Sequence, residues 1–508
     1  MQKPKDNGQI RSGLTLAAPF LVLLAVSTWH HAPWGDELHA WGLAVASANP
    51  IVLFHNLHYD GHPGLWHIML WSAASVSHSP FAMQAVHAVL AAAAITIVAI
   101  RAPFSRTEKI LLLLNYFMVF EYAVLARNYG MTLLLAIIYA QIRGTAPERP
   151  VLAAGILGLM ANTNIYGVIV AGLLGLEYLW NYIVVKGRIA TAGYAGVVRG
   201  CVLFGALLLL SAATVWPAAD ISHFGIGTAG ASRPAIGRFA YQLLRTVVTP
   251  FVPIDYSFPA SFAFPGNLYE GGKRVWLSLA FLPCIGGALW VIFRKQPGFL
   301  LVLLTTALTA AWFAFAVYPS AVRHMGVVFV GFVVALWVAR MEAPRPAHGR
   351  PDAAAIAVLG LLAMGAFGGC LAIMGQWMRP FSIDQITVDW LVAHEPPDAA
   401  LVGFPDMRAE PIAILMRRRF YALDCRCEDS YVRFLNRRDG FTEASIPERL
   451  EEAVHFYRPR PVVLLAGDPL SDSVRATIAA RGLALTERVH LTGAERDKEM
   501  TIFDVTSR

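Results

Sequence analysis

Long apolar stretches constrain the fold of this 508-residue chain more than any other feature. Runs such as 14–29, 81–100, 198–216 and 353–375 have about the ~20 residues that a helix needs to cross a bilayer. Charged residues make up only 15% of the chain, against roughly a quarter in a typical soluble protein. The sequence therefore predicts a polytopic α-helical membrane protein.

The last quarter of the chain differs in composition from the rest. From about Gln376 the charged residues return and the apolar runs shorten to strand length. Predicted strands alternate there with predicted helices, which indicates a small three-layer α/β domain. The expected strands are 400–404, 420–423, 462–466 and 500–505, and the expected helices are 410–419, 447–457 and 471–481. We therefore expect a membrane domain at 1–375 and a soluble domain at 376–508.

Basic residues indicate how the chain is oriented. Lys3, Lys5 and Arg11 precede the first apolar run without an A-x-A-type cleavage site, so this run is expected to remain as a signal anchor with a cytoplasmic N-terminus. The later basic loops all become cytoplasmic if the chain crosses the membrane about eleven times. The expected spans are 13–29, 80–100, 110–126, 129–143, 150–165, 166–184, 198–216, 275–293, 298–317, 325–339 and 353–375.

This topology places the loops 30–79 and 217–274 and the C-terminal domain on the outer side, which is the periplasm if the membrane is a bacterial inner membrane. The segment 63–76 is short for a span and is expected to be interfacial or re-entrant. The net charge of +7 follows from basic loops between spans, so no nucleic-acid partner is predicted. Cys425 and Cys427 give only weak support for a metal or redox role.

The first outer loop contains the most informative residues. Asp36 and Glu37 come directly after the first span, a helix-like stretch covers 38–47, and a return segment contains His58, Asp60 and His62 before Pro63. Carboxylates at the edge of a membrane are costly unless they face water or form a site. Capping of the following helix by Asp36 is the alternative interpretation, because Asp is a favoured N-cap.

This order of elements resembles the GT-C superfamily of membrane glycosyltransferases. The similarity rests on the outward Asp36-Glu37, the helix after it and the segment His62-Pro63-Gly64-Leu65-Trp66. It is to the protein-mannosyltransferase and aminoarabinose-transferase branch, and to lipopolysaccharide sugar transferases. The resemblance implies a donor sugar on a polyprenyl phosphate, with Asp36 as general base or orienter and Glu37 in second place. His62 would contact the phosphate, where the family often has a Lys, and His58 and Asp60 would line the substrate site.

The resemblance leaves the cofactor open. Some GT-C enzymes use a divalent cation held by acidic residues, so a hard-ion site at Asp36 or Glu37 is possible. The second Asp-x-Asp motif that such enzymes need is not evident in this sequence. No cofactor is therefore predicted with certainty, and no metal-ligand set is assigned.

Cationic residues lie in two short outer loops, where positive charge is disfavoured. The first loop contains Arg127, Asn128 and Tyr129 and the second contains Arg323 and His324, and all five are predicted to bind substrate. A lipid phosphate bound by both arginines would explain their position, because a guanidinium grips phosphate in a bidentate manner. An ion pair of Arg127 with Glu121, and snorkelling of Arg323 at a span end, are the structural alternatives.

These residues favour an enzyme that moves a sugar, a hexose or a pentose, from a polyprenyl-phosphate donor to an extracytoplasmic glycan, lipid or protein. The alternative is a transporter or flippase of lipid-linked glycans. Transport predicts paired broken spans in two repeated halves and charges at mid-membrane depth. The charges of this chain collect at one face instead, which favours the transferase.

Overall fold

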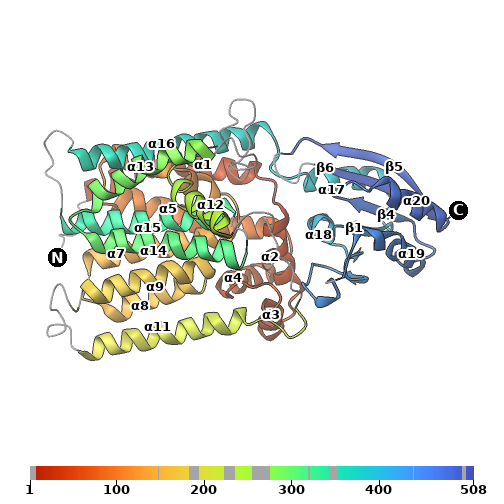
Figure 1. Cartoon of the computed structure of the whole chain (residues 1–508), viewed down its shortest axis with the longest axis horizontal. Coiled ribbons are helices and arrows are strands. Elements are labelled where there is room, and N and C mark those ends of the chain that lie inside the picture. Colours follow the sequence, from red (N-terminus) through yellow and green to blue (C-terminus); the bar gives the residue numbers. More distant parts are fainter. Residues whose placement is uncertain are drawn as a thin grey trace.

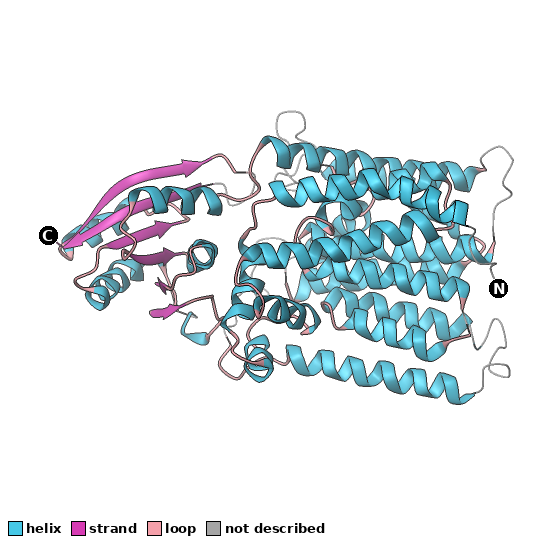
Figure 2. Ribbon diagram, turned by 180° about the vertical axis from the view of Figure 1, so that it is seen from behind, coloured by secondary structure: helices cyan, strands magenta, loops and turns pink. Residues whose placement is uncertain are grey.

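The computed structural model describes residues 7–146, 148–181, 183, 194–221, 235–254, 275–318, 321–343, 352–438, 440–494 and 499–507. Most helices run side by side along the long axis of the molecule, and the C-terminal region forms a separate body at one end (Figure 1). The strands are confined to that body (Figure 2). The predicted division into a helical part and a mixed C-terminal part is therefore visible in the arrangement of the elements.

The helical part begins with a long helix and three shorter ones. These are α1 (Asn7–His30), α2 (Gly35–Ala46), α3 (Pro50–Leu57) and α4 (Leu65–Ala74). The elements that follow are α5 (Pro80–Arg101), α6 (Arg106–Leu113), the π-helical turn η1 (Phe117–Glu121), α7 (Asn128–Thr145), α8 (Pro150–Ala161), α9 (Ile165–Trp180), α11 (Tyr194–Val215), α12 (Ala235–Val248), α13 (Val275–Phe293), α14 (Pro297–Ala316), α15 (Val322–Glu342) and α16 (Ala353–Met378).

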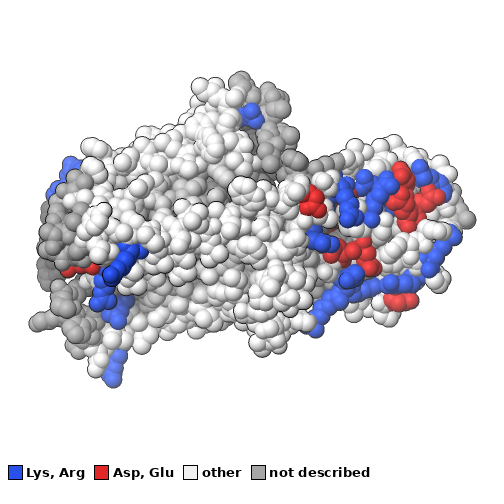
Figure 3. Space-filling model, turned by 90° about the horizontal axis from the view of Figure 1, so that it is seen from below, with Lys and Arg blue, Asp and Glu red and all other residues white. Residues whose placement is uncertain are grey.

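Within the described residues, seven helices are long and apolar enough to cross a membrane: α1, α5, α11, α13, α14, α15 and α16. Figure 3 shows the face of the helical body as a broad surface with few charged residues, between a charged C-terminal body and charges near the opposite end. The chain is thus a multi-pass helical membrane protein, as predicted. The four other expected spans fall on α6 with η1, α7, α8 and α9, so the total of eleven stays a prediction.

Two parts of the sequence prediction differ from the structure. The expected span 110–126 is broken, because α6 ends at Leu113 and the chain continues as η1. The Asn115 side chain accepts a hydrogen bond from the amide of Phe117 (3.1 Å), and such local bonds compete with regular helix. The expected outer loop 217–274 contains the helix α12, which packs against α13, α14 and α15. Most of the remainder of that loop lies outside the described residues.

The short helix α4 has 10 residues. At 1.5 Å per residue it is about 15 Å long, half the thickness of the hydrocarbon core. It packs against α2 and α5. This length agrees with the expectation that 63–76 is interfacial or re-entrant, which stays a prediction.

The two ends of the helical body carry different residues. At one end the last turns of α7 and α15 meet, where Arg143 pairs with Glu342 (3.4 Å) and Arg340 pairs with Glu108 (2.6 Å). At the other end the same two helices begin, close to Arg127 and Arg323. The helices α2 to α4 and the C-terminal body lie at this second end (Figure 1). Among the described residues, the basic side chains at the first end, such as Arg143 and Arg340, are thus separated from the first loop by the length of the bundle.

The C-terminal body is built on one mixed six-stranded sheet in the order β3-β2-β1-β4-β6-β5. The strands β1, β2 and β4 are parallel, whereas β3, β6 and β5 pair in antiparallel fashion. The strands are β1 (Ala400–Phe404), β2 (Phe420–Ala422), β3 (Cys427–Asp429), β4 (Val462–Ala466), β5 (Leu483–Thr492) and β6 (Glu499–Ser507). The helices are α17 (Asp384–His394), α18 (Asp406–Leu415), α19 (Ile446–Tyr457) and α20 (Asp472–Ala480), with single turns at η5 (Asn436–Arg438) and η6 (Glu443–Ser445).

Alternate residues of the central strand β1 face two separate cores. Val402 packs with α19 and α20 residues on one face, and Leu401 packs with α17 and α18 residues on the other. The predicted three-layer α/β domain is therefore confirmed. The edge strands β3 and β5 were not predicted. Most of their residues are only partly buried or exposed, so their sequences lack the apolar run of a central strand.

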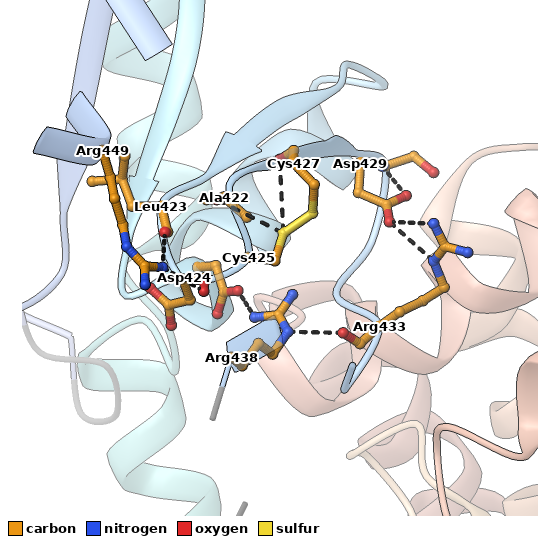
Figure 4. The surroundings of a disulfide bond; sticks show 11 residues. Ala422, Leu423, Asp424, Cys425, Cys427, Asp429, Arg433, Arg438 and Arg449 are labelled. Carbon is orange, nitrogen blue, oxygen red and sulfur yellow. Dashed lines mark hydrogen bonds and ion pairs between the residues drawn. A yellow bond between two sulfur atoms is a disulfide. The ribbon is translucent and has the colours of Figure 1, made fainter. Parts of the chain in front are cut away.

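A disulfide joins Cys425, in the loop after β2, to Cys427, the first residue of β3 (Figure 4). Arg449 of α19 donates hydrogen bonds to two main-chain carbonyls of this loop, those of Leu423 and Asp424, both at 2.7 Å. The weakly supported metal role of these cysteines is thus replaced by a cross-link, because disulfide sulfurs offer no thiolate to a metal.

The C-terminal body docks on the first loop of the membrane part. Helix α18 packs on α2, and a side chain at Gly42 would overlap Ile414. His39 of α2 pairs with Glu410 of α18 (Nδ1–Oε1 2.9 Å). A second connection joins Ile221 and Leu435 in an antiparallel bridge. These contacts hold α2, and with it the residues of the first loop, between the bundle and the sheet domain.

Candidate functional site

Asp36 lies in the first turn of α2, at the end of the bundle that faces the C-terminal domain. Its carboxylate forms an ion pair with the guanidinium of Arg323, in the first turn of α15. Arg127, immediately before α7, donates a hydrogen bond to the main-chain carbonyl of Asp36. The structure thus brings together three predicted residues from three separate segments, the most distant of them 287 positions apart.

The two arginines are buried, each with only 8% of its surface exposed. The Nε atoms of both lack a hydrogen-bond partner among the described residues. A guanidinium has five N–H donors, and each arginine also stands at a helix N-terminus, where the helix dipole favours anions. This end of the bundle therefore has unused donors and positive potential for an anionic group.

Aromatic side chains form the walls around Arg323. The Trp34 ring lies against its guanidinium, with the guanidinium carbon 5.4 Å from the ring centroid. Tyr122 donates a hydrogen bond to the Arg323 carbonyl (2.5 Å) and stacks on Tyr129 with ring centroids 5.6 Å apart. The sequence singled out Tyr129 but not Trp34 or Tyr122. The sequence indicated a role for Trp34 only through its position directly before Gly35 and Asp36.

His324 takes part in the same aromatic cluster. Its ring stacks on Tyr166 at 4.6 Å between centroids and lies 5.9 Å from Tyr129. Its Nδ1 accepts a hydrogen bond from the amide of Ala321 (3.0 Å), so the ring also caps α15. The hydroxyl of Tyr166 is buried and lacks a hydrogen-bond partner among the described residues. His324 thus contributes the shape of the site, and Tyr166 contributes a further unused polar atom.

Glu37 is fully buried next to Asp36. Its carboxylate accepts three hydrogen bonds, from His31 Nε2 (2.7 Å), the Trp34 amide (3.2 Å) and the Ala126 amide (2.5 Å). The last bond ties the start of α2 to the residue before Arg127. This geometry favours a positioning role for Glu37, because its oxygens already have partners on both sides.

Asp60 is surrounded by three histidines at the junction with the C-terminal domain. Its carboxylate lies 3.0 Å from His62 Nδ1, 3.3 Å from His39 Nε2 and 3.4 Å from His67 Nε2. Burial alone would raise the pKa of Asp60, but the facing imidazoles, His62 first, hold it well below its usual range. The sequence predicted Asp60 and His62 as neighbours in the site and missed His39 and His67.

The pKa values of two histidines in this cluster, His67 and His39, are shifted in opposite directions. Burial lowers the pKa of His67 to about 4, against the opposing effect of the Asp60 carboxylate. Burial also disfavours the charged form of His39, but the carboxylates of Glu410 and Asp60 outweigh it and raise the pKa to about 10. At neutral pH His39 is therefore a cation between two carboxylates.

Two predicted substrate-binding residues point elsewhere. His58 Nδ1 lies 2.5 Å from the carbonyl of Trp216, at the end of the bundle near α11. Asn128 is buried, and its side-chain oxygen accepts a hydrogen bond from Asn164 (3.4 Å). Asn164 in turn donates to Thr132 (2.8 Å). These bonds connect α7 with the turn before α9, so Asn128 serves the packing behind the site.

No group of three or more His, Cys, Asp and Glu side chains in the described part of the chain is arranged to hold a metal ion. The proposed hard-ion site at Asp36 and Glu37 lacks the convergence that it requires. Asp36 faces Arg323, whereas Glu37 faces His31 and two amides.

The fold was compared with known proteins. Neither a family model nor a curated protein matches the sequence. The chain is similar in structure to ArnT from Cupriavidus metallidurans in the apo state, with a TM-score of 0.56, 13% identity and 97% of each chain covered. The structure of the same protein bound to undecaprenyl phosphate gives a TM-score of 0.51 at 12% identity, again over 97% of each chain. The predicted fold, a polytopic helical bundle with a C-terminal domain, is therefore shared with ArnT over 97% of the chain.

Proposed function

We propose that this protein is a membrane glycosyltransferase that moves a sugar from a polyprenyl-phosphate donor to an acceptor outside the cytoplasm. The observation that supports this most is the convergence of the Asp36 carboxylate with Arg323 and Arg127 at one end of the bundle. A carboxylate beside two cations offers a proton acceptor and an anion-binding group in one place.

The donor phosphate is assigned to the two arginines. Their guanidinium groups and the helix N-termini beside them suit a phosphate at the membrane surface. The similar ArnT structure is one with undecaprenyl phosphate bound, which supports a polyprenyl carrier for this chain also. His62, exposed by about a quarter at its side chain, is proposed as an additional contact from the α4 side.

A phosphate bound at this end of the bundle also acts on the ion pair between Asp36 and Arg323. A phosphate that binds Arg323 competes for its donors and frees the Asp36 carboxylate to accept a proton. The acceptor hydroxyl then gives its proton to Asp36, its oxygen bonds to the anomeric carbon, and the bond from that carbon to the phosphate oxygen breaks. The electron pair leaves with the polyprenyl phosphate, whose charge the arginines stabilise.

The membrane-embedded catalytic domain is proposed to comprise residues 1–375, and residues 376–508 an extracytoplasmic domain. The basic loops at the opposite end of the bundle favour a cytoplasmic location for that end. The disulfide between Cys425 and Cys427 favours an oxidising compartment for the sheet domain. Both observations support a bacterial inner membrane protein whose active site faces the periplasm.

Binding of undecaprenyl phosphate to the purified protein tests this proposal directly. Arg127→Lys and Arg323→Lys keep the charge but lose the bidentate geometry of a guanidinium. We expect each to weaken binding about tenfold, the effect of one lost charge-assisted hydrogen bond. Arg294→Lys is the matched control, because Arg294 is exposed in the loop between α13 and α14 at the other end of the bundle.

Unchanged affinity in both variants would remove the phosphate site from this end of the bundle. The proposal would also fail if Arg294→Lys weakened binding as much as the other two changes. Retained transfer in the Asp36→Asn protein, with normal binding of the carrier, would leave the phosphate site intact and would exclude Asp36 as the base.

A further inference from the structure

A pocket lies between α2 and the C-terminal domain, with a volume of about 320 Å³. Its apolar floor comes from Trp41, Val45 and Ala46 of α2 and from Ile414 of α18. Its rim is formed by His78, Ser430 and three consecutive arginines, 417–419. No acidic side chain is among the lining residues. The pocket thus combines a cationic rim with an apolar floor.

This pocket is separate from the candidate active site. Val45 follows Asp36 by nine positions on α2, about two and a half turns, so the two side chains point to opposite faces of the helix. The axial separation is about 13 Å. The pocket therefore faces away from Arg127 and Arg323, and the transfer reaction has no use for its cations.

The pocket also lies at the level where a membrane surface is expected. His78 stands two residues before the start of α5, one of the seven candidate spans. Val76, in the same turn, is 88% exposed. Exposed aliphatic residues beside the end of a span are typical of the interface between acyl chains and headgroups. A lipid in the outer leaflet can therefore reach the pocket from the side.

The backbone at Arg417 is unusual. Helix α18 ends in a Schellman motif, in which the amide of Arg418 bonds to the carbonyl of Ala413 (2.8 Å). This motif places Arg417 in the left-handed region, with φ 53°, where glycine is the unstrained residue. An arginine at this position strains the backbone, but it places a guanidinium at the rim of the pocket. The helix dipole favours cations at this end, but it does not require one at the strained position.

The charges of the three arginines are only partly balanced. Arg418 donates to the carbonyl of Ala399, and burial together with the nearby Arg460 lowers its pKa. Arg419 is largely exposed and pairs with Glu428 at 3.4 Å. The Arg417 side chain has no ion pair or hydrogen bond within the described residues. An anion at the rim would relieve this excess of positive charge.

We infer that this pocket binds the phosphate headgroup of an anionic membrane lipid. The arginines hold the phosphate, and the floor of α2 contacts the first carbons of the lipid. A free phosphate would leave the apolar floor without a partner, which favours the lipid as the source of the anion. The bound lipid bridges α2 and α18, and so fastens the C-terminal domain to the membrane surface. This inference is independent of the proposed transfer reaction.

Native mass spectrometry of the detergent-purified full chain tests the inference, with phosphatidylglycerol as the anionic probe and phosphatidylcholine as the zwitterionic one. Arg417→Gly removes the charge while relaxing the backbone, so the protein is expected to fold at least as well. Arg419→Gln removes a second charge. Arg481→Gln is the control, since Arg481 also stands at the C-terminal end of a helix, α20, outside the pocket.

We expect phosphatidylglycerol to bind in preference to phosphatidylcholine, and each pocket variant to weaken its binding about tenfold. The control should leave this affinity unchanged, and all three variants should keep their thermal midpoint. Equal binding of the two lipids, or unchanged binding in Arg417→Gly, would overturn the inference. Displacement of phosphatidylglycerol by an equal concentration of inorganic phosphate would also overturn it, because the site would then recognise a free anion.

Discussion

Replacing Glu37 by Gln tests whether this residue positions the site or takes part in the chemistry. The carboxylate is fully buried and accepts hydrogen bonds from His31 and from the amides of Trp34 and Ala126. Gln has one acceptor oxygen and an NH₂ group of the same shape. The Gln oxygen can accept a hydrogen bond from the Ala126 amide or from the Trp34 amide. The remaining main-chain amide then faces the NH₂ group of Gln, which is itself a donor. At least one main-chain donor is left buried without a partner.

The magnitude follows from these bonds. A hydrogen bond to a charged group contributes about 1.5–3 kcal/mol, and an unsatisfied buried donor costs about 1–3 kcal/mol. The removal of a buried charge offsets part of this loss. We expect Glu37→Gln to lower the free energy of unfolding by about 2–4 kcal/mol. The loss should appear even without substrate.

Equilibrium unfolding in mixed detergent micelles measures this free energy. Glu451→Gln is the matched control, because the Glu451 side chain is 49% exposed and its ion pair within the described residues is with the exposed Arg481. Such a surface change is expected to stay within about 0.5 kcal/mol of the unmodified protein. A Glu37→Gln protein as stable as this control would refute the positioning role, and a loss of transfer without a loss of stability would favour a chemical one.

Three further predictions concern other parts of the molecule. Asp36→Asn should abolish transfer while the protein remains folded, because Asn keeps the shape but takes no proton; turnover and unfolding of the same preparation test this. The pKa of His39 is raised to about 10, so its contribution to stability is complete below pH ~6.5 and is lost as the pH rises through about 10. Over this pH range the backbone amides where α2 contacts α18 should lose protection against hydrogen exchange. In the Glu410→Gln protein this protection should change less with pH. Cys425 and Cys427 should react with a maleimide only after reduction, in a variant whose free cysteines Cys201, Cys284 and Cys370 are replaced by Ser; labelling of that variant without reductant would contradict the disulfide.

The sequence by itself determined the class of the fold. Span-length apolar runs, the basic loops and the return of charges after Gln376 predict a membrane bundle with a mixed C-terminal domain. These features can be read from short segments of sequence, because a bilayer requires a fixed length of apolar helix and basic residues accumulate in cytoplasmic loops. The same reasoning placed Asp36, Arg127 and Arg323 at one end of the bundle. It failed at 110–126, where the side chain of Asn115 interrupts the helix.

Only the tertiary structure decided which partner each of these residues takes. Asp36 and Arg323 are 287 positions apart, and His39 and Glu410 are 371 apart. Apolar runs limit the length of a helix but not its rotation about its axis or its neighbours. The packing of α2 against the bundle and the sheet domain sets this rotation. It turns Asp36 towards Arg323 and buries the adjacent Glu37 among amide donors, so two neighbouring carboxylates that look alike in the sequence acquire different roles.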